Sequence, residues 1–377
     1  MKILPGSTLG MLGGGQLGRM FTIAARTMGY EVIVLDPDSD SPAGKLATQH
    51  ICAEYTDSDA LNQLAHDCAA ITTEFENVPA STLEKLAASC PVRPDAPAVK
   101  ITQDRIHEKI FLRDNGFPTA PFAVIHSVDD LQAGIEAIGT PAILKVSRFG
   151  YDGKGQSSLH AASDGAKAWQ ALNHEACVLE QRMPLDIEVS VVLARGLDGE
   201  VNTYPVAENI HASGILDVSI VPARIGKILA DNVTSMARRI ADKLDYVGVM
   251  AVEFFISNGE LLVNEVAPRP HNSGHYSLDA CVTDQFEQQV RAVCGLPLGE
   301  TRLLSPVVMI NMLGNIWHHG QAPDWSKLFD HPNIKLHLYG KKEARPGRKM
   351  GHFNVIASTV DAALNLAIDT QLKLSKA

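Results

Sequence analysis

The chain has few cysteines, and their spacing excludes the sites that cysteines usually build. None of the six belongs to a Cys-x-x-Cys pair, which argues against zinc fingers and a redox motif. Scattered single cysteines are typical of reduced thiols. Because the apolar run at the N-terminus is too short for a secretory signal, we expect a cytoplasmic protein. The cysteines are Cys52, Cys68, Cys90, Cys177, Cys281 and Cys294.

Excess positive charge and long hydrophobic runs are also missing. With 33 basic and 43 acidic residues the formal net charge is −10, which argues against binding to nucleic acid or an anionic membrane. No stretch approaches the length of a transmembrane helix, and the sequence has no internal repeats or low-complexity tracts. The 377 residues, 45% of them hydrophobic and 20% charged, suffice for two or three globular domains.

A glycine-rich loop without a Walker motif follows a predicted strand in the middle of the chain. The strand is the apolar run 142–146, and three glycines follow between Gly150 and Gly155. Glycine takes positive φ at little cost and lets backbone N–H groups approach a ligand closely. Lys145 on the strand and Lys154 in the loop would suit a polyphosphate. The alternative is a mobile surface hairpin with solvated lysines.

A second glycine-rich turn lies near the N-terminus. Residues 9–12 and 31–36 are typical of strands and residues 19–28 of a helix, with Gly-x-Gly-x-x-Gly at residues 13–18 between them. Asp36 ends the second strand of this βαβ unit, as in dinucleotide-binding proteins. Such a turn binds any phosphate. The motif alone therefore fits both a nicotinamide-dependent oxidoreductase and a ligase that holds another phosphate.

Acidic residues follow a third predicted strand of the same domain. Glu74 and Glu76 come directly after the buried-type strand 69–73. Ligands of doubly wound sheets bind at the carboxyl ends of strands, so these glutamates are candidate site residues. The alternative is a solvated acidic turn before a helix at residues 81–88. The proline-rich segment 91–97 is expected to end the first domain.

Two glutamates lie inside apolar strands of a predicted hairpin. Glu253 and Glu265 flank a turn at residues 257–260, and their burial is costly unless compensated. Oxygen ligands alone favour Mg²⁺ bound together with nucleotide phosphates. A two-residue turn would pair Glu253 with Asn264, whereas a three-residue loop would place the glutamates opposite each other, with Cβ atoms roughly 5 Å apart. The magnesium hypothesis needs a register that keeps both on one face.

Two histidines and a basic cluster follow this hairpin. His271 and His275 are four residues apart, but no glutamate follows the first and Pro270 and Gly274 interrupt a helix, so zinc is not expected. Five cations lie within the nine residues 341–349 of an otherwise acidic chain. A run of charges is usually a solvated face.

Five motifs together resemble the N5-carboxyaminoimidazole ribonucleotide synthetase family of the ATP-grasp superfamily. They follow the family's order and extend from Gly13 to His352, which is nearly the whole chain. One departure is Phe149, because the family's central loop often opens with two glycines. The motifs are residues 16–20, 74–77, 150–156, 268–275 and 345–352.

The resemblance implies a mixed α/β and α+β fold with three domains. Residues 1–100 would form a Rossmann-like pre-ATP-grasp domain that binds substrate. Residues 101–300 would form an ATP-grasp domain of two lobes, the lid lobe at about 120–185. Residues 301–377 would form a small β-rich C-terminal domain that opens with a strand at residues 307–313.

The resemblance also implies a nucleotide site. The hinge after a strand at residues 176–180 would hold adenine, Glu188 the ribose, and Arg105, on a helix predicted over residues 101–115, the phosphates. From the residues alone, Arg105 and His211 are equally well surface side chains. The residues assigned to ATP are Arg105, Lys145, Gly150, Tyr151, Asp152, Gly153, Lys154, Gly155, Gln156, Glu180, Gln181, Arg182, Met183, Glu188, His211, Asn264 and Glu265.

A second substrate, 5-aminoimidazole ribonucleotide (AIR), is implied in the same way. Its expected contacts are Gly15, Gln16, Leu17, Glu76, Tyr151, Asn272, Ser273, Lys342, Arg345 and Arg348. Glu253 and Glu265 would bind Mg²⁺. The expected catalytic residues are Arg269, His271, Lys342 and Asp152.

The implied reaction joins AIR and bicarbonate in purine biosynthesis, with ATP becoming ADP and phosphate. Carboxyphosphate, or CO₂ released from it, would carboxylate the exocyclic amine, and the enzyme would act as a homodimer. A formate-dependent glycinamide ribonucleotide ligase on the same scaffold is one alternative. An NAD(P)-dependent dehydrogenase and a non-catalytic nucleotide-binding module are two others.

Overall fold

The computed structural model describes residues 2–150 and 153–375, and its first part is a parallel sheet. The strand order is β3–β2–β1–β4, and every pairing in this sheet is parallel. The predicted βαβ unit is therefore confirmed. The elements are β1 (Thr8–Leu12), α1 (Gln16–Thr27), β2 (Glu31–Leu35), β3 (Gln49–Ile51), α2 (Ser58–Asp67), β4 (Ala70–Thr73) and α3 (Ala80–Ala87).

The first sheet shares its core with later parts of the chain. One face packs against α2, α3 and α4 (Ala96–Thr102). The other face packs against α1 and against α10 (Gln285–Val293), which contributes Phe286, Val290 and Val293 to the same apolar cluster. The N-terminal part therefore buries its second face only when the rest of the chain is present.

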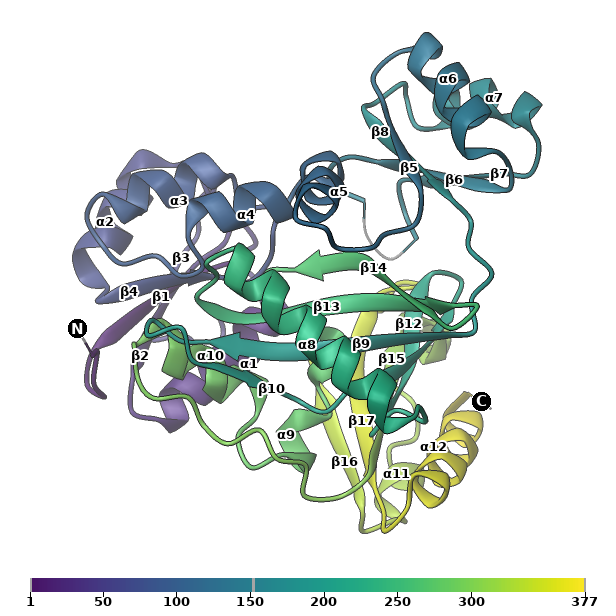
Figure 1. Cartoon of the computed structure of the whole chain (residues 1–377). Helices are drawn as coiled ribbons and strands as arrows, with labels where there is room; N and C mark the ends of the chain where they lie inside the picture. The colour runs from purple at the N-terminus through teal and green to yellow at the C-terminus, as the bar shows by residue number, and fades with distance from the viewer. Residues whose placement is uncertain (1, 151–152, 376–377) are drawn as a thin grey trace.

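A separate lobe with its own small sheet projects from the body, as Figure 1 shows. Its strand order is β5–β8–β6–β7, and all three pairings are antiparallel. This lobe corresponds to the expected lid. Its elements are β5 (Phe122–Ile125), α6 (Val128–Ile138), β6 (Ala142–Val146), β7 (Gln156–Leu159), η1 (Ala162–Asp164), α7 (Gly165–Ala171) and β8 (Cys177–Gln181).

The body is built on a nine-stranded sheet that includes the C-terminal strands. The order is β14–β13–β9–β11–β12–β15–β17–β16, and β10 pairs with β9. Because β12 pairs with β15, the C-terminal strands extend this sheet instead of forming one of their own. The strands are β9 (Ile187–Arg195), β10 (Val201–Thr203), β11 (Ala207–Ala212), β12 (Ile215–Val221), β13 (Gly248–Ser257), β14 (Glu260–Ala267), β15 (Val307–Leu313), β16 (Ile334–Leu338) and β17 (Lys349–Ile356).

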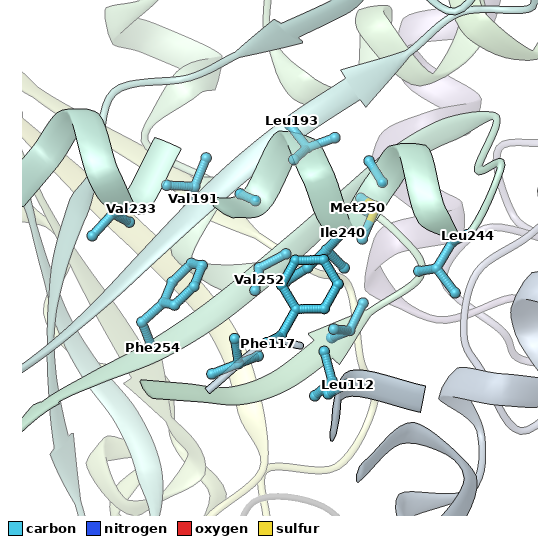
Figure 2. Packing of buried hydrophobic residues seen from close by; sticks show 14 of the residues in the cluster. Leu112, Phe117, Val191, Leu193, Val233, Ile240, Leu244, Met250, Val252 and Phe254 are labelled. Atoms are coloured by element: carbon cyan, nitrogen blue, oxygen red, sulfur yellow. The ribbon is translucent and has the colours of Figure 1, made fainter. Parts of the chain in front are cut away.

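Helices cover the body of the molecule. A 17-residue helix, α8, lies over β9 and β13, and its buried residues interdigitate with Val191, Leu193, Val252 and Phe254 (Figure 2). Among the described residues, no helix combines the length and apolar character needed to span a bilayer. The bounds of α8 are Lys227–Lys243. The other helices of the body and the C-terminal part are η2 (Asn272–Gly274), α9 (Ser277–Ala280), η3 (Gly314–Ile316), η4 (His318–Gly320), α11 (Ser326–Phe329) and α12 (Val360–Ser375).

The prediction of a single helix over residues 101–115 is wrong. The chain forms α4 and then a second helix, α5 (Arg105–Asp114). Asp104 separates them because it is the N-cap of α5, where its carboxylate accepts the backbone N–H groups of Ile106 and His107. The break sets the direction of α5, whose first residue is Arg105.

Candidate active site

Glu253 and Glu265 lie directly opposite each other on β13 and β14. The hairpin turns at Asn258 and Gly259, both with positive φ, so the two-residue turn is correct. A β-bulge at Asn264 then shifts the register by one residue, so that Glu253 pairs with Glu265 and not with Asn264. The requirement that both carboxylates share one face is met by this bulge.

Several candidate residues share the polar face of the nine-stranded sheet. Glu253 pairs with Ser190 of β9, and Glu188 lies two residues away on the same strand, hence on the same face. His211 Nδ1 lies 2.8 Å from Glu188 Oε2. Burial lowers the pKa of His211, but Glu188 and Glu253 outweigh this effect and raise it. The alternation along β9 therefore buries Val189 and Val191 under α8 and presents Glu188 and Ser190 on the other face.

The two carboxylates have different partners and different affinities for protons. Arg105 donates to Glu265 Oε2 over 2.9 Å, whereas His271 Nε2 lies 3.2 Å from Glu253 Oε1. Burial and the charge of Glu265 raise the pKa of Glu253 to about 7. Burial also acts to raise the pKa of Glu265, but Arg105 outweighs it and lowers this pKa.

The Glu253–Glu265 pair fits a divalent cation that is also coordinated by oxygens of a bound molecule such as a phosphate. Two buried carboxylates that repel each other gain stability when a cation lies between them. Within residues 2–150 and 153–375, no cluster of three or more His, Cys, Asp or Glu side chains could enclose a metal. A cation bound here would take two oxygen ligands from Glu253 and Glu265, and phosphate or water oxygens would supply the others.

A buried ion cluster connects the lid lobe to the hairpin. Glu180 Oε2 on β8 accepts from Lys145 Nζ over 3.0 Å and lies 3.5 Å from Lys109 Nζ. Burial acts to raise the pKa of Glu180, but the ammonium groups of Lys109 and Lys145 outweigh it and lower the pKa to about 2. Lys109, a residue of α5, also donates to the backbone carbonyl of Asn264 over 2.9 Å.

The expected hinge follows β8, but two of its N–H groups are already bonded. The N–H of Gln181 donates to the Pro121 carbonyl and that of Arg182 to the Pro141 carbonyl. An adenine ring at this hinge would therefore need groups other than these two, and the hinge continues with Met183. The structure leaves the assignment of Gln181 and Arg182 to ATP a prediction.

The central glycine-rich loop reaches the same region. Arg105 donates to the carbonyl of Gly150 over 3.3 Å, and Gly153 and Gly155 have φ values of +74° and +70°. Phe149, at the position where the family often has glycine, has φ +62°, a conformation that favours glycine. Tyr151 and Asp152 lie outside the described residues, and Lys154 and Gln156 continue the loop into β7.

A cavity separates the first domain from the hairpin. Its lining includes Glu76, Arg105, Gly150 and Glu265. Arg269 Nε donates to Glu76 Oε2 over 2.6 Å, so the arginine of the fourth motif and the glutamate of the second meet at this place. Burial acts to raise the pKa of Glu76, but Arg269 outweighs it and lowers this pKa.

The fourth motif is largely buried behind this pair. Asn272 and Asn311 exchange two side-chain hydrogen bonds, and Ser273 accepts from Ser190 over 2.8 Å. The N–H of Ser273 donates to His271 Nδ1, which leaves the Nε2 proton to face Glu253. Asn272 and Ser273 thus orient the motif, and their expected contact with AIR stays a prediction.

The first glycine-rich turn holds carboxylates of its own chain. The N–H of Gly14 donates to Asp36 Oδ2 over 2.6 Å, and those of Gly15 and Leu17 donate to Glu74. A Cβ atom at Gly15 would lie 2.2 Å from Glu74 Oε1, so glycine is required here to admit this carboxylate. An incoming phosphate at this turn would have to displace Glu74.

The C-terminal basic cluster meets the first domain through Lys341. Lys341 Nζ donates to Gln16 Oε1 and to the carbonyl of Lys349. Lys342, the residue expected in the site, instead binds Asp40 over 3.1 Å, and 77% of its side chain is exposed. The assignment of Lys342 to the site stays a prediction, and Lys341 is the lysine that contacts the turn in this structure.

The two arginines of the cluster lie further from the turn. Arg345 Nε is 3.7 Å from Glu343 Oε2 on an exposed face, and Arg348 donates to the carbonyl of Glu343 over 2.9 Å. In this structure both arginines contact Glu343 and neither is bonded to the turn, so their expected contacts with AIR stay predictions. Glu108, Lys109 and Lys341 are residues of this region that the sequence did not assign to the site. Only the spacing of Arg105, Glu108 and Lys109 on one helix face could have indicated two of them.

Three domain models match consecutive parts of the chain. The ribonucleotide synthetase preATP-grasp domain matches residues 6–103, and the ATP-grasp domain matches residues 110–286. The phosphoribosylaminoimidazole carboxylase C-terminal domain matches residues 307–365. The chain is thus an ATP-grasp ligase with all three parts in order.

Individual relatives show which family of ATP-grasp ligases this chain resembles. N5-carboxyaminoimidazole ribonucleotide synthase of Bacillus subtilis is 43% identical over 361 residues, 95% of this chain and 94% of the relative. The enzyme of Brucella melitensis is 46% identical over 354 residues, covering 93% and 96%.

Solved structures agree with these relatives. An ADP complex of N5-carboxyaminoimidazole ribonucleotide synthetase has a TM-score of 0.92 at 42% identity, and covers 98% of both chains. The enzyme of Aspergillus clavatus in complex with ADP and 5-aminoimidazole ribonucleotide has a TM-score of 0.90 at 30% identity, and covers 98% and 99%. The chain belongs to the N5-carboxyaminoimidazole ribonucleotide synthase family, whose members are ligases of purine biosynthesis that form a C–N bond.

Membership in this family argues against the dehydrogenase alternative, and so does the first turn. In a dinucleotide-binding domain the glycine-rich turn holds a pyrophosphate and the acid after the second strand holds a ribose. Here Asp36 is bonded to Gly14 and Tyr55, and Glu74 occupies the N–H groups of Gly15 and Leu17.

Proposed function

We propose that this chain carboxylates the exocyclic amine of AIR with bicarbonate while it converts ATP to ADP and phosphate. Family membership supports the proposal. The observation that carries it is a cavity lined by Glu76, Arg105 and Glu265. Of these, Glu76 is bonded to Arg269, and Glu265 lies opposite Glu253. Phosphoryl transfer needs this combination, because it depends on positioning and on neutralising charge.

The nucleotide binds between the lid lobe and the sheet. Lys145 and the loop residue Lys154 neutralise its phosphates, with Arg105 behind them. Glu188 accepts the ribose hydroxyls, and His211 holds Glu188 in place. Mg²⁺, bound by Glu253 and Glu265, supplies further charge neutralisation on the phosphates when it is present.

AIR binds on the other side of the cavity. Glu76 lines the cavity, and Gln16 and Lys341, which are bonded to each other, bind the substrate phosphate together with the predicted Lys342. When AIR and the activated carboxyl group bind, Arg269 exchanges its pairing with Glu76 for the anionic intermediate. His271, whose pKa is lowered by burial and by the charge of Arg269, stays neutral and keeps Glu253 oriented.

Activation has to occur on the carboxyl side. Bicarbonate is a poor electrophile, and phosphorylation turns one of its oxygens into a leaving group. Attack of a bicarbonate oxygen on the γ-phosphorus gives carboxyphosphate and ADP. The amine then attacks the carboxyl carbon of carboxyphosphate, and inorganic phosphate leaves with that oxygen. In the other route, carboxyphosphate first separates into CO₂ and phosphate, and the amine attacks the CO₂.

Two measurements test the reaction. ADP release should require bicarbonate and increase when AIR is added, whereas a formate-dependent enzyme would respond to formate and glycinamide ribonucleotide. With ¹⁸O-labelled bicarbonate, and with its exchange with water controlled, one label should appear in the released phosphate. Unlabelled phosphate would show that carboxyphosphate is not formed.

We also propose a homodimer in the cytoplasm. The resemblance to the family supports the dimer, and the six cysteines, all free among the described residues, support a reducing compartment. Sedimentation equilibrium at micromolar concentration tests the dimer, and a mass of 40.6 kDa would contradict it.

A further inference from the structure

Helix α5 bonds to the outer edge of β14 at the bulge, whereas the N–H of Val263 on the same strand donates to the carbonyl of Pro118. β14 is the outermost strand of the nine-stranded sheet, and Figure 1 shows α5 beside it. Lys109 Nζ donates to the carbonyl of Asn264, and the N–H of Val266 donates to Glu108 Oε1. These are the two peptide groups that flank Glu265, so side chains of α5 replace the bonds that a neighbouring strand would make.

The same helix face also holds the side chain of Glu265. Arg105, Glu108 and Lys109 occupy positions i, i+3 and i+4, which lie together on one face of a helix. Arg105 donates to Glu265 Oε2 over 2.9 Å. One helix turn, started by the Asp104 cap, therefore fixes both the backbone and the carboxylate of Glu265.

This arrangement is costly, so a simple cover for the strand edge does not explain it. Glu108 is 2% exposed and Lys109 is 1% exposed. Burial and the charge of Glu265 raise the pKa of Glu108 to about 8, and burial lowers the pKa of Lys109. An edge strand can bond to water, and apolar residues would cover it at a lower cost than two buried ionisable side chains.

Lys109 also reaches the lid lobe. Its Nζ lies 3.5 Å from Glu180 Oε2, which is the acceptor of Lys145. The residue that holds the bulge thus touches the carboxylate that holds a lysine of the nucleotide site. One side chain therefore contacts both Glu180 of the lid lobe and the peptide before Glu265.

We propose that Glu108 and Lys109 are positioning residues that hold the β14 bulge in the register in which Glu265 faces Glu253. Through Glu180, Lys109 couples this register to the lid lobe. The inference rests on the proposed metal role of Glu253 and Glu265, but its structural part concerns only the backbone around Glu265.

Hydrogen exchange in the nucleotide-free protein tests the structural part. Glu108→Ala and Lys109→Met should each speed exchange in the segment 261–267 by roughly 3- to 10-fold, because each removes one hydrogen bond to the bulge. Glu108→Gln keeps an acceptor and should restore slow exchange. Arg113→Met, on the exposed side of the same helix where Arg113 pairs with Asp114, is the control.

Binding of Mn²⁺ in the presence of ADP, followed by electron paramagnetic resonance, tests the link to the metal. Glu108→Ala and Lys109→Met should weaken it by roughly 10- to 100-fold, as expected when the support of a ligand is lost. Arg113→Met should leave it unchanged. If circular dichroism shows that Glu108→Ala does not fold, both measurements are made on Lys109→Met alone.

The outcomes separate the two proposals. Folded variants with wild-type exchange and wild-type Mn²⁺ affinity would overturn the positioning role. If the wild-type protein itself binds no Mn²⁺ with ADP, the metal role of Glu253 and Glu265 is wrong. The exchange rates of segment 261–267 would still decide whether Glu108 and Lys109 hold the bulge.

Discussion

At the scale of single residues, the charges of the site are paired with one another. Arg105 is bound to Glu265, Arg269 to Glu76, and Lys145 to Glu180. A buried charge without a partner would cost several kcal/mol, so these pairs keep the ligand-free site stable. Each pair can exchange a partner for a phosphate or a cation. The site is therefore arranged to bind charged ligands without creating unpaired buried charges.

Removal of one carboxylate of the hairpin should abolish most of the metal-dependent turnover. Glu265→Gln keeps the size of the side chain but removes its charge, so Mg²⁺-dependent ADP formation should fall by more than about 100-fold. Glu260→Gln, an exposed glutamate at the turn of the same hairpin, is the control and should keep wild-type activity. Steady-state rates against free Mg²⁺ check this, and a nearly active Glu265→Gln enzyme would contradict the metal site.

Two neighbouring lysines should differ in their effect on AIR. Lys341→Met removes a cation that contacts Gln16, so the KM for AIR should rise roughly 10- to 100-fold, as for the loss of one charged hydrogen bond. Lys342→Met removes an exposed cation that pairs with Asp40, so its KM for AIR should rise less. The KM for ATP should not change in either variant. If Lys342→Met has the larger effect, the loop binds AIR in another conformation.

At the scale of elements, the hairpin shows how far the sequence leads. The sequence predicts the hairpin and its turn region, but it leaves a two-residue turn and a three-residue loop open. The bulge at Asn264 has no local signal, because Glu108 and Lys109 stabilise it from a helix more than 150 residues away in sequence. The partner of Glu74 and the direction of Lys341 are likewise decided by tertiary contacts.

A second group of elements should make the protein sensitive to acid. His352 on β17 stacks on His337 of β16 at 4.6 Å, and lies 4.9 Å from His275. Tyr339 bonds to His352 Nδ1, and Asp279 binds His337. Burial lowers the pKa values of His275 and His352 well below the usual range, and the neighbouring histidines lower them further.

The sign of the effect follows from the depressed pKa values. Below the unfolded-state pKa of about 6.5, the unfolded chain binds protons that the folded protein does not, so stability falls as the pH decreases. The loss is about 1.4 kcal/mol per pH unit for each such histidine. His352→Asn should lower the melting temperature at pH 7.5. It should also make the decrease in melting temperature from pH 7.5 to pH 5.5 smaller than in the wild type.

Thermal unfolding at the two pH values measures this drop. His66→Asn is the matched control, because 88% of the His66 side chain is exposed and its replacement should leave the drop unchanged. A drop in His352→Asn equal to that of the wild type would show that the buried cluster is not the source of the acid sensitivity.

At the scale of the whole molecule, the domains differ in how much they depend on one another. The C-terminal strands continue the central sheet through β12 and β15 and share one apolar cluster with β12. The first domain uses α10 to cover its sheet. The lid lobe instead has its own sheet and its own core, which includes Leu144, Leu179 and Trp169. Sequence motifs predict the order of these parts but not which of them share a core.

This difference predicts opposite results for two deletions. Pro121 and Gln181 are bonded to each other across the base of the lid, where the Gln181 N–H donates to the Pro121 carbonyl over 2.9 Å. Replacing residues 122–180 by a short glycine-serine linker should therefore leave a soluble body that unfolds cooperatively but no longer binds ADP. Removing residues 306–377 should expose the edge of β12 together with the buried Val218 and Ile220, and this variant should aggregate. Size-exclusion chromatography and thermal unfolding compare the two, and a soluble, cooperatively folded C-terminal truncation would show that the nine-stranded sheet does not depend on its last three strands.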